Sequence, residues 1–146
     1  LWRLGARQFY WYYFANVAYS SILHNRSGLT GSYNTGFREK LSFKAFALLQ
    51  KQIGPYHFVK IIREDNHVYA YLLKDYTTGS DIIIAWRPTA SHHLVQQPEQ
   101  FSVPGKVSKI VPVLNSQTVS FKEKNNLLQI GLSGVPVLIY FNKQIE

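Results

Sequence analysis

The sequence predicts a mainly β protein, an antiparallel β-sandwich of about seven to eight strands preceded by one strand and one helix. Two observations support this fold class. After Gly54, short apolar segments alternate with turn-forming residues, and aromatic residues, which favour strands, make up 15% of the chain. With 146 residues, 46% of them hydrophobic, the chain can bury a real core. We therefore expect a strand-loop-helix unit over residues 1–54 and a sandwich domain over residues 55–146.

The first expected strand covers residues 9–14, with the sequence FYWYYF. This continuous aromatic run is typical of a strand that is covered on both faces. Left uncovered, it would invite aggregation, so we expect the remainder of a parent protein or a partner subunit to cover it. Residues 15–34 are small and polar and predict a loop.

The only expected helix covers residues 40–53. Its apolar residues Leu41, Ala45, Leu48 and Leu49 recur at three- and four-residue spacing, which indicates an amphipathic helix. The predicted helix ends at Gly54 and Pro55, because a glycine followed by a proline stops a helix.

The rest of the chain predicts seven short strands bounded by turn formers. The connection over residues 91–105 is expected to be a long surface loop. The expected strands are residues 57–62, 68–74, 80–86, 106–113, 118–122, 127–130 and 135–141. Trp86 ends the apolar run of the third of these strands and is expected to belong to the core.

Composition limits the function classes. The net charge of +8 would allow binding to nucleic acid, but the basic residues are scattered, with no nucleic-acid-binding motif, and we expect no nucleic-acid partner. There is no Cys, and no apolar run is long enough for a membrane span. There is also no Met, which leads us to expect a processed or partial product. The sequence leaves the compartment open, and an extracellular or cell-surface location is compatible with it.

No local pattern predicts a cofactor, a metal site or a catalytic residue in this chain. The five histidines include no pair with metal-ligand spacing, and His92 and His93 would point in opposite directions on a strand. Ser91 beside His92 lacks the turn of a serine nucleophile, and GLTG at residues 28–31 lacks the spacing of a phosphate-binding loop.

Several motifs resemble the C-terminal part of clan A glycoside hydrolases. Trp11 on the first strand, the loop at residues 28–31 and the helix start KLSFKAF at residues 40–46 resemble the last strand, loop and helix of their (β/α)8 barrel. VYAYLLKDYTTGSDIIIAWRP and LLQIGLSGVPVLIY are similar to the opening and closing strands of their C-terminal sandwich. Leu41 stands where these enzymes usually have Pro.

The resemblance implies a β-sandwich that buttresses a carbohydrate-binding barrel. It implies carbohydrate contacts by Trp11, Tyr13 and Asn16, at or just past the end of the last barrel strand. In such enzymes the two carboxyl groups that glycoside hydrolysis requires belong to earlier strands. None of the eight acidic residues here ends a barrel-like strand, so we expect no complete catalytic site in this chain.

Two alternatives remain at this point. The chain could be a stand-alone β-sandwich binding or assembly module whose aromatic N-terminal strand pairs with a partner subunit by strand addition. It could also be a basic domain that binds acidic polysaccharides, which requires Lys and Arg side chains to gather on one face of the fold.

Overall fold

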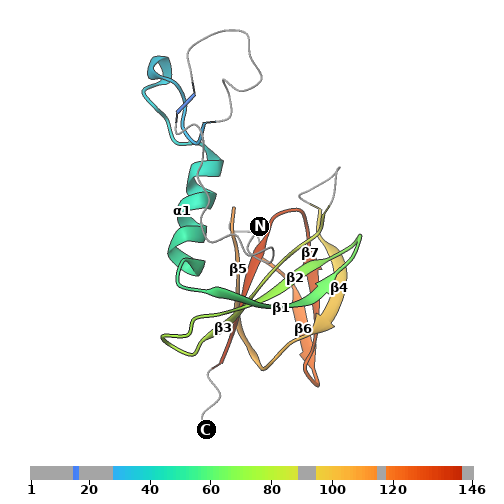
Figure 1. The fold of residues 1–146 in the computed structure, drawn as a ribbon. Helices are drawn as coiled ribbons and strands as arrows, with labels where there is room; N and C mark the ends of the chain where they lie inside the picture. Colours follow the sequence, from blue (N-terminus) through green and yellow to red (C-terminus); the bar gives the residue numbers. More distant parts are fainter. Residues whose placement is uncertain (1–14, 17–27, 89–94, 115–117, 143–146) are drawn as a thin grey trace. The chain divides into compact units, whose positions relative to one another are not determined.

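The computed structural model describes residues 15–16, 28–88, 95–114 and 118–142. The expected strand over residues 9–14, with Trp11 and Tyr13, lies outside these residues, as do Ser91, His92 and His93. The chain divides into two compact units, Leu1–Gly54 and Pro55–Glu146. The ribbon in Figure 1 follows the course of both.

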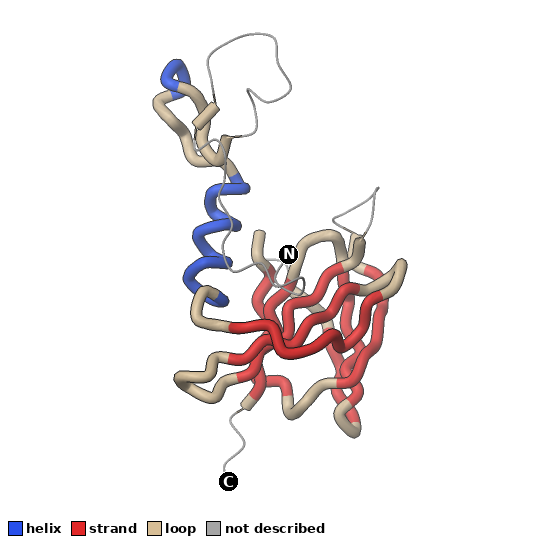
Figure 2. Tube along the Cα trace, in the orientation of Figure 1, coloured by secondary structure: helices blue, strands red, loops and turns tan. Residues whose placement is uncertain are grey.

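The first unit contains the helices of the described chain (blue in Figure 2). A single 3-10 turn, η3, covers Tyr33–Thr35, and the helix α1 covers Leu41–Ile53, within the range that the sequence predicts. Gly54 ends α1, and its N–H donates to the carbonyl of Gln50 at 3.0 Å. No helix of the described residues combines the length and the hydrophobicity needed to cross a membrane.

The second unit is an antiparallel β-sandwich (red strands in Figure 2), and the chain as a whole is mainly β, as predicted. One sheet has five strands in the order β1-β2-β3-β8-β5, and the other has three in the order β4-β7-β6. The strands are β1 (His57–Glu64), β2 (Tyr69–Lys74), β3 (Asp81–Trp86), β4 (Gln97–Ser102), β5 (Val107–Pro112), β6 (Phe121–Lys124), β7 (Leu127–Leu132) and β8 (Val137–Phe141).

The core lies between the two sheets because side chains alternate between the faces of each strand. The five-stranded sheet contributes apolar residues such as Leu72, Ile83 and Ile139, and the three-stranded sheet contributes residues such as Phe101 and Leu128. Ile83, Ile139 and Leu128 are all 0% exposed. This layer is the main apolar core of the sandwich.

Two predictions for the strands are wrong in part. The expected loop over residues 91–105 contains strand β4, which pairs with β7. The strand expected over residues 118–122 is instead Phe121–Lys124. Asn125 and Asn126, with φ of 51° and 59°, form the two-residue turn of the β6-β7 hairpin, and this turn sets where β6 ends.

A charged cluster ties β1, β4 and the end of β3 together. The side chain of Glu99, on β4, is only 10% exposed. Its carboxylate accepts a hydrogen bond from Arg63 at 3.3 Å and forms an ion pair with Arg87 Nη1 at 3.1 Å. Arg63 also pairs with Asp65 at 2.6 Å. Arg87 Nε is buried and has no hydrogen-bond partner among the described residues. Glu99 therefore neutralises two arginines in a partly buried place.

Candidate functional site

Three extended segments of the first unit come together, with Thr30 in the middle segment. Thr30 pairs in parallel with Ala15 and antiparallel with Glu39. The carbonyl of Leu29 accepts from the N–H of Lys40 at 3.1 Å. Leu29 and Thr30 are each only 3% exposed. Residues far apart in the sequence therefore share one small hydrogen-bonded framework.

The glycines of the GLTG sequence allow the close approach of these segments. A Cβ atom at Gly28 would lie 2.5 Å from the backbone nitrogen of Asn16 and would also overlap the carbonyl carbon of Ala15. A Cβ atom at Gly31 would overlap the hydroxyl of Thr35. Gly28 therefore needs glycine because of space, whereas a side chain at Gly31 would displace the Thr35 hydroxyl.

Lys40 and Asn16 are joined through their side chains. Lys40 Nζ donates to Asn16 Oδ1 at 2.7 Å and to the carbonyl of Gly28 at 2.7 Å. Asn16 Oδ1 also accepts from the backbone N–H of Gly28 at 3.2 Å. Asn16, one of the three predicted carbohydrate-binding residues, thus holds Lys40 in place. The other two, Trp11 and Tyr13, lie outside the described residues.

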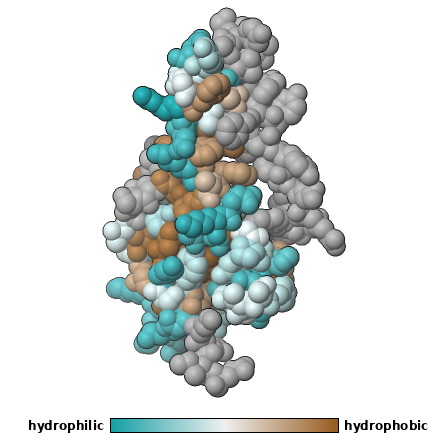
Figure 3. All heavy atoms as spheres, turned by 90° about the vertical axis from the view of Figure 1, so that its left-hand side faces the viewer, coloured by the Kyte–Doolittle hydropathy of each residue, from teal (hydrophilic) through white to brown (hydrophobic). Residues whose placement is uncertain are grey.

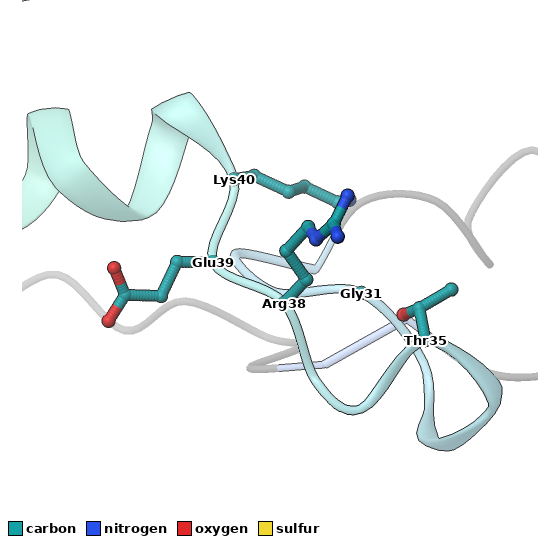
Figure 4. Close-up of a pocket in the computed structure, with 5 residues that line it drawn as sticks. All are labelled: Gly31, Thr35, Arg38, Glu39 and Lys40. Atoms are coloured by element: carbon teal, nitrogen blue, oxygen red, sulfur yellow. The ribbon is translucent and has the colours of Figure 1, made fainter.

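A pocket of about 410 Å³ opens beside this framework, lined by Gly31, Thr35, Arg38, Glu39 and Lys40 (Figure 4). The side chains of Arg38 and Lys40 extend toward the same side, and that of Glu39 extends toward the opposite side (Figure 4). The alternation of side chains along an extended backbone explains this arrangement. The wall shared by Arg38 and Lys40 is therefore cationic.

The charged groups that line this pocket are two cations and one carboxylate. Glu39 is the only acidic residue of the first unit, whereas glycoside hydrolysis requires two carboxyl groups on either side of the scissile bond. The described residues also hold no group of three or more His, Asp or Glu side chains that could bind a metal ion. The groups that line the pocket are the two cations, the Glu39 carboxylate and the Thr35 hydroxyl, which donates to the carbonyl of Ser32 at 2.8 Å and can accept a further hydrogen bond.

The second unit carries a different feature, an apolar outer face on its five-stranded sheet. Tyr71, Leu73, Ile82, Ile84 and Leu138 alternate with the core residues of their strands and so lie on the face opposite the core. Three of these side chains are fully buried: Leu73 is 1% exposed, and Ile82 and Leu138 are 0% exposed. Both faces of this sheet are therefore apolar.

Aromatic residues extend this outer face. The ring of Trp86 makes edge-to-face contacts with the rings of Tyr69 and Tyr71, with distances between ring centroids of 5.4 Å and 5.5 Å. The rings of Phe58 and Tyr71 make a similar contact, with their centroids 6.2 Å apart. The prediction that Trp86 belongs to the core is wrong, because Trp86 is half-buried on the outer face. Figure 3 shows one side of the chain, where hydrophobic residues (brown) lie among hydrophilic ones (teal).

The three-stranded sheet has an ordinary polar outer face. Gln100, Gln129 and Lys122 lie directly opposite one another across its strands and are exposed. Only one sheet of the sandwich thus carries apolar residues on both faces, the pattern of a sheet that is covered on both sides.

Two aspartates fix the turns that lead into β2 and β3. Hydrogen bonds from the side chain of Arg63 and the backbone N–H groups of His67 and Val68 lower the pKa of Asp65 to about 2. Hydrogen bonds from Thr78 and Thr77 lower the pKa of Asp75, which is 6% exposed. Both carboxylates serve the local structure as acceptors in their charged form.

In comparisons with known proteins, no protein family, no curated protein and no solved structure matches this chain.

Arg38 and the side chain of Lys40 had no predicted role. The available signal was the Arg38-Glu39-Lys40 sequence, in which two cations flank one acid and so share one side of an extended segment. That signal is weak without the pocket, because alternating charges are common on solvated surfaces.

Proposed function

We propose that this chain is the C-terminal portion of a glycoside hydrolase-like protein, in which the β-sandwich buttresses a carbohydrate-binding barrel. The catalytic carboxyl groups would belong to residues outside this chain. The observation that carries the proposal is the apolar outer face of the five-stranded sheet. A sheet with two apolar faces needs cover on both. Leu73, Ile82 and Leu138 are already buried within this chain, and a barrel packed against the rest of the outer face would cover the half-buried Tyr71, Ile84 and Trp86.

The resemblance of the first unit to the end of a barrel supports the same proposal. In this interpretation the segment ending at Asn16 closes the barrel, and α1 is its last helix. Ligands of such barrels bind at the carboxyl ends of the strands, which is where Asn16 and the pocket beside Lys40 would lie. Carbohydrate contacts by Trp11, Tyr13 and Asn16 remain predictions of this proposal.

The first experiment is the intact mass of the protein isolated from its source. A mass well above 16.8 kDa, the mass of this chain, is expected, together with hydrolysis of an oligosaccharide by that longer protein. A mass of 16.8 kDa would contradict the proposal.

A pair of variants then tests the buttress in the longer protein. Ile84→Glu places a charge on the apolar outer face, and Gln129→Glu places the same charge on the polar outer face of the other sheet. We expect the first to lower the melting temperature by several degrees and the second to leave it nearly unchanged, because only the first buries an unpaired charge. Ile84 is half-buried in the 146-residue chain already, so the comparison is repeated in that chain. An effect of Ile84→Glu no larger in the longer protein than in the 146-residue chain would mean that no barrel covers the apolar face.

The second candidate is the stand-alone assembly module whose aromatic N-terminal strand pairs with a partner subunit. The outer face also favours it, since a partner subunit could cover its half-buried residues Tyr71, Ile84 and Trp86. Analytical ultracentrifugation of the 146-residue chain measures its oligomeric state and so distinguishes the assembly module from the glycoside hydrolase portion. A dimer that Ile84→Glu dissociates, combined with an intact mass of 16.8 kDa, would support the assembly module.

A further inference from the structure

Positive charge is concentrated in the first unit. Residues 1–54 contain seven basic residues and one acidic residue, a net charge of +6. Residues 55–146 contain nine basic and seven acidic residues, a net charge of +2. Three quarters of the net charge of +8 therefore belongs to about one third of the chain. Such asymmetry attracts anionic ligands to one part of a protein.

Three cations of the second unit lie beside carboxylates. Arg63 and Arg87 share Glu99, and Lys74 lies 3.9 Å from Asp81. The first unit has only one side-chain carboxylate, that of Glu39, and this group extends away from the cationic wall of the pocket (Figure 4). The positive potential of the first unit is therefore not cancelled by carboxylates of its own.

The pocket places two of these cations where a ligand can reach them. Its volume of about 410 Å³ falls within the usual range of small-molecule sites, about 300–1,000 Å³. Arg38 is exposed, and Lys40 is held by Asn16 and Gly28 at 2.7 Å. A guanidinium matches a carboxylate or sulfate with two parallel hydrogen bonds, while a fixed ammonium adds positive potential beside it.

We propose that the pocket lined by Arg38 and Lys40 binds an acidic sugar unit, one that carries a carboxylate or a sulfate ester. Arg38 pairs with the acidic group, and Lys40 adds charge from a position fixed by Asn16. The Thr35 hydroxyl oxygen lines the same pocket and can accept a hydrogen bond from a sugar hydroxyl. The inference rests on the proposed function for the class of ligand, a carbohydrate, and adds the charge of that ligand.

Calorimetric titration of the 146-residue chain at low salt tests this inference. The probes are an oligogalacturonide, which carries carboxylates, its methyl ester, which is neutral, and a heparin-derived oligosaccharide, which carries sulfates. Binding of at least one acidic probe, and at least tenfold weaker binding of the methyl ester, is expected. The two acidic probes distinguish a carboxylate from a sulfate as the recognised group.

Three variants locate the site. We expect Arg38→Gln to weaken binding of the acidic probe about fivefold, the upper range for a solvent-exposed ion pair. Arg38→Lys keeps the charge but loses the planar fork, so its effect should be smaller. Lys44→Gln removes the same charge from an exposed position on α1 and should change binding less than twofold.

Several outcomes would overturn the inference. Equal effects of Arg38→Gln and Lys44→Gln would mean that net charge alone attracts the probe, and equal affinity for a single-stranded DNA oligomer would mean non-specific polyanion binding. Binding of the methyl ester as tight as that of the acid would overturn the acidic preference but keep a carbohydrate ligand. Absence of binding to any probe would overturn the inference, while the buttress proposal keeps its separate test by mass and melting temperature.

Discussion

Ile82 and Ile83 offer a matched test of the two apolar faces of the five-stranded sheet. They are neighbours on β3, have identical side chains and are each 0% exposed, but Ile83 belongs to the core between the sheets and Ile82 lies on the outer face. We expect Ile82→Ala and Ile83→Ala to lower the free energy of unfolding by similar amounts.

The magnitude follows from burial. Truncating a fully buried Ile to Ala typically costs 2–5 kcal/mol, because transfer free energy is lost and a cavity remains. We take about 3 kcal/mol for each variant, with about 1 kcal/mol for the milder Ile82→Val. A truncation on an unpacked sheet surface would cost less than about 0.5 kcal/mol.

Urea unfolding followed by far-ultraviolet circular dichroism measures both values. With a slope of about 1 kcal/mol per molar urea, a loss of about 3 kcal/mol lowers the unfolding midpoint by about 3 M. A small shift for Ile82→Ala beside a large shift for Ile83→Ala would refute the second apolar layer and remove the main support for the buttress.

Four further predictions concern other parts of the chain. Glu99→Gln should lower the free energy of unfolding by about 2 kcal/mol, since Arg87 loses its charged partner in a partly buried place, and urea unfolding measures this loss. Gly28→Ala should perturb the first unit alone, because the added Cβ overlaps neighbouring backbone, and amide exchange in residues 28–40 should rise. The lowered pKa of Asp65, about 2, contributes stability that is present above the usual carboxyl pKa and is lost as pH falls toward 2, so Asp65→Asn should flatten the acid side of the stability profile. Burial and nearby aspartates raise the pKa of Tyr56, so its contribution is present below about pH 10 and is lost as pH rises through the raised value. Tyr56→Phe should flatten the alkaline side, measured by thermal unfolding.

The fold class was predictable because its signals are local. Strand periodicity and turn residues depend on neighbours in sequence, so most strands and the helix were found near their observed positions. β4 was missed because QPEQFS is polar and contains Pro98. Its structure explains this composition: β4 is an edge strand that pairs with β7 alone, and an edge strand tolerates a residue without an N–H donor.

The pocket was not predictable from local patterns. It depends on the meeting of residues near Ala15, Thr30 and Glu39, whose sequence separation hides their contact. Only Asn16 among its neighbours was proposed, from a resemblance, and the reason for glycine at Gly28 becomes visible once the approaching atoms are known. The prediction for Trp86 was wrong for a related reason. The apolar sequence at the end of a strand does not reveal on which of two apolar faces its last side chain lies.

The buttress and the acidic-sugar site can fail separately because they depend on different units and different physics. The outer face of the five-stranded sheet depends on removal of apolar area from water, which salt does not weaken. The pocket at Arg38 and Lys40 depends on charge at an exposed site, which salt screens over about 10 Å at 0.1 M. Raising the salt concentration should therefore weaken binding of the acidic probe while the effect of Ile84→Glu on melting temperature persists. A buttress effect that disappeared in salt would indicate that charge, and not apolar burial, holds the sandwich to its partner.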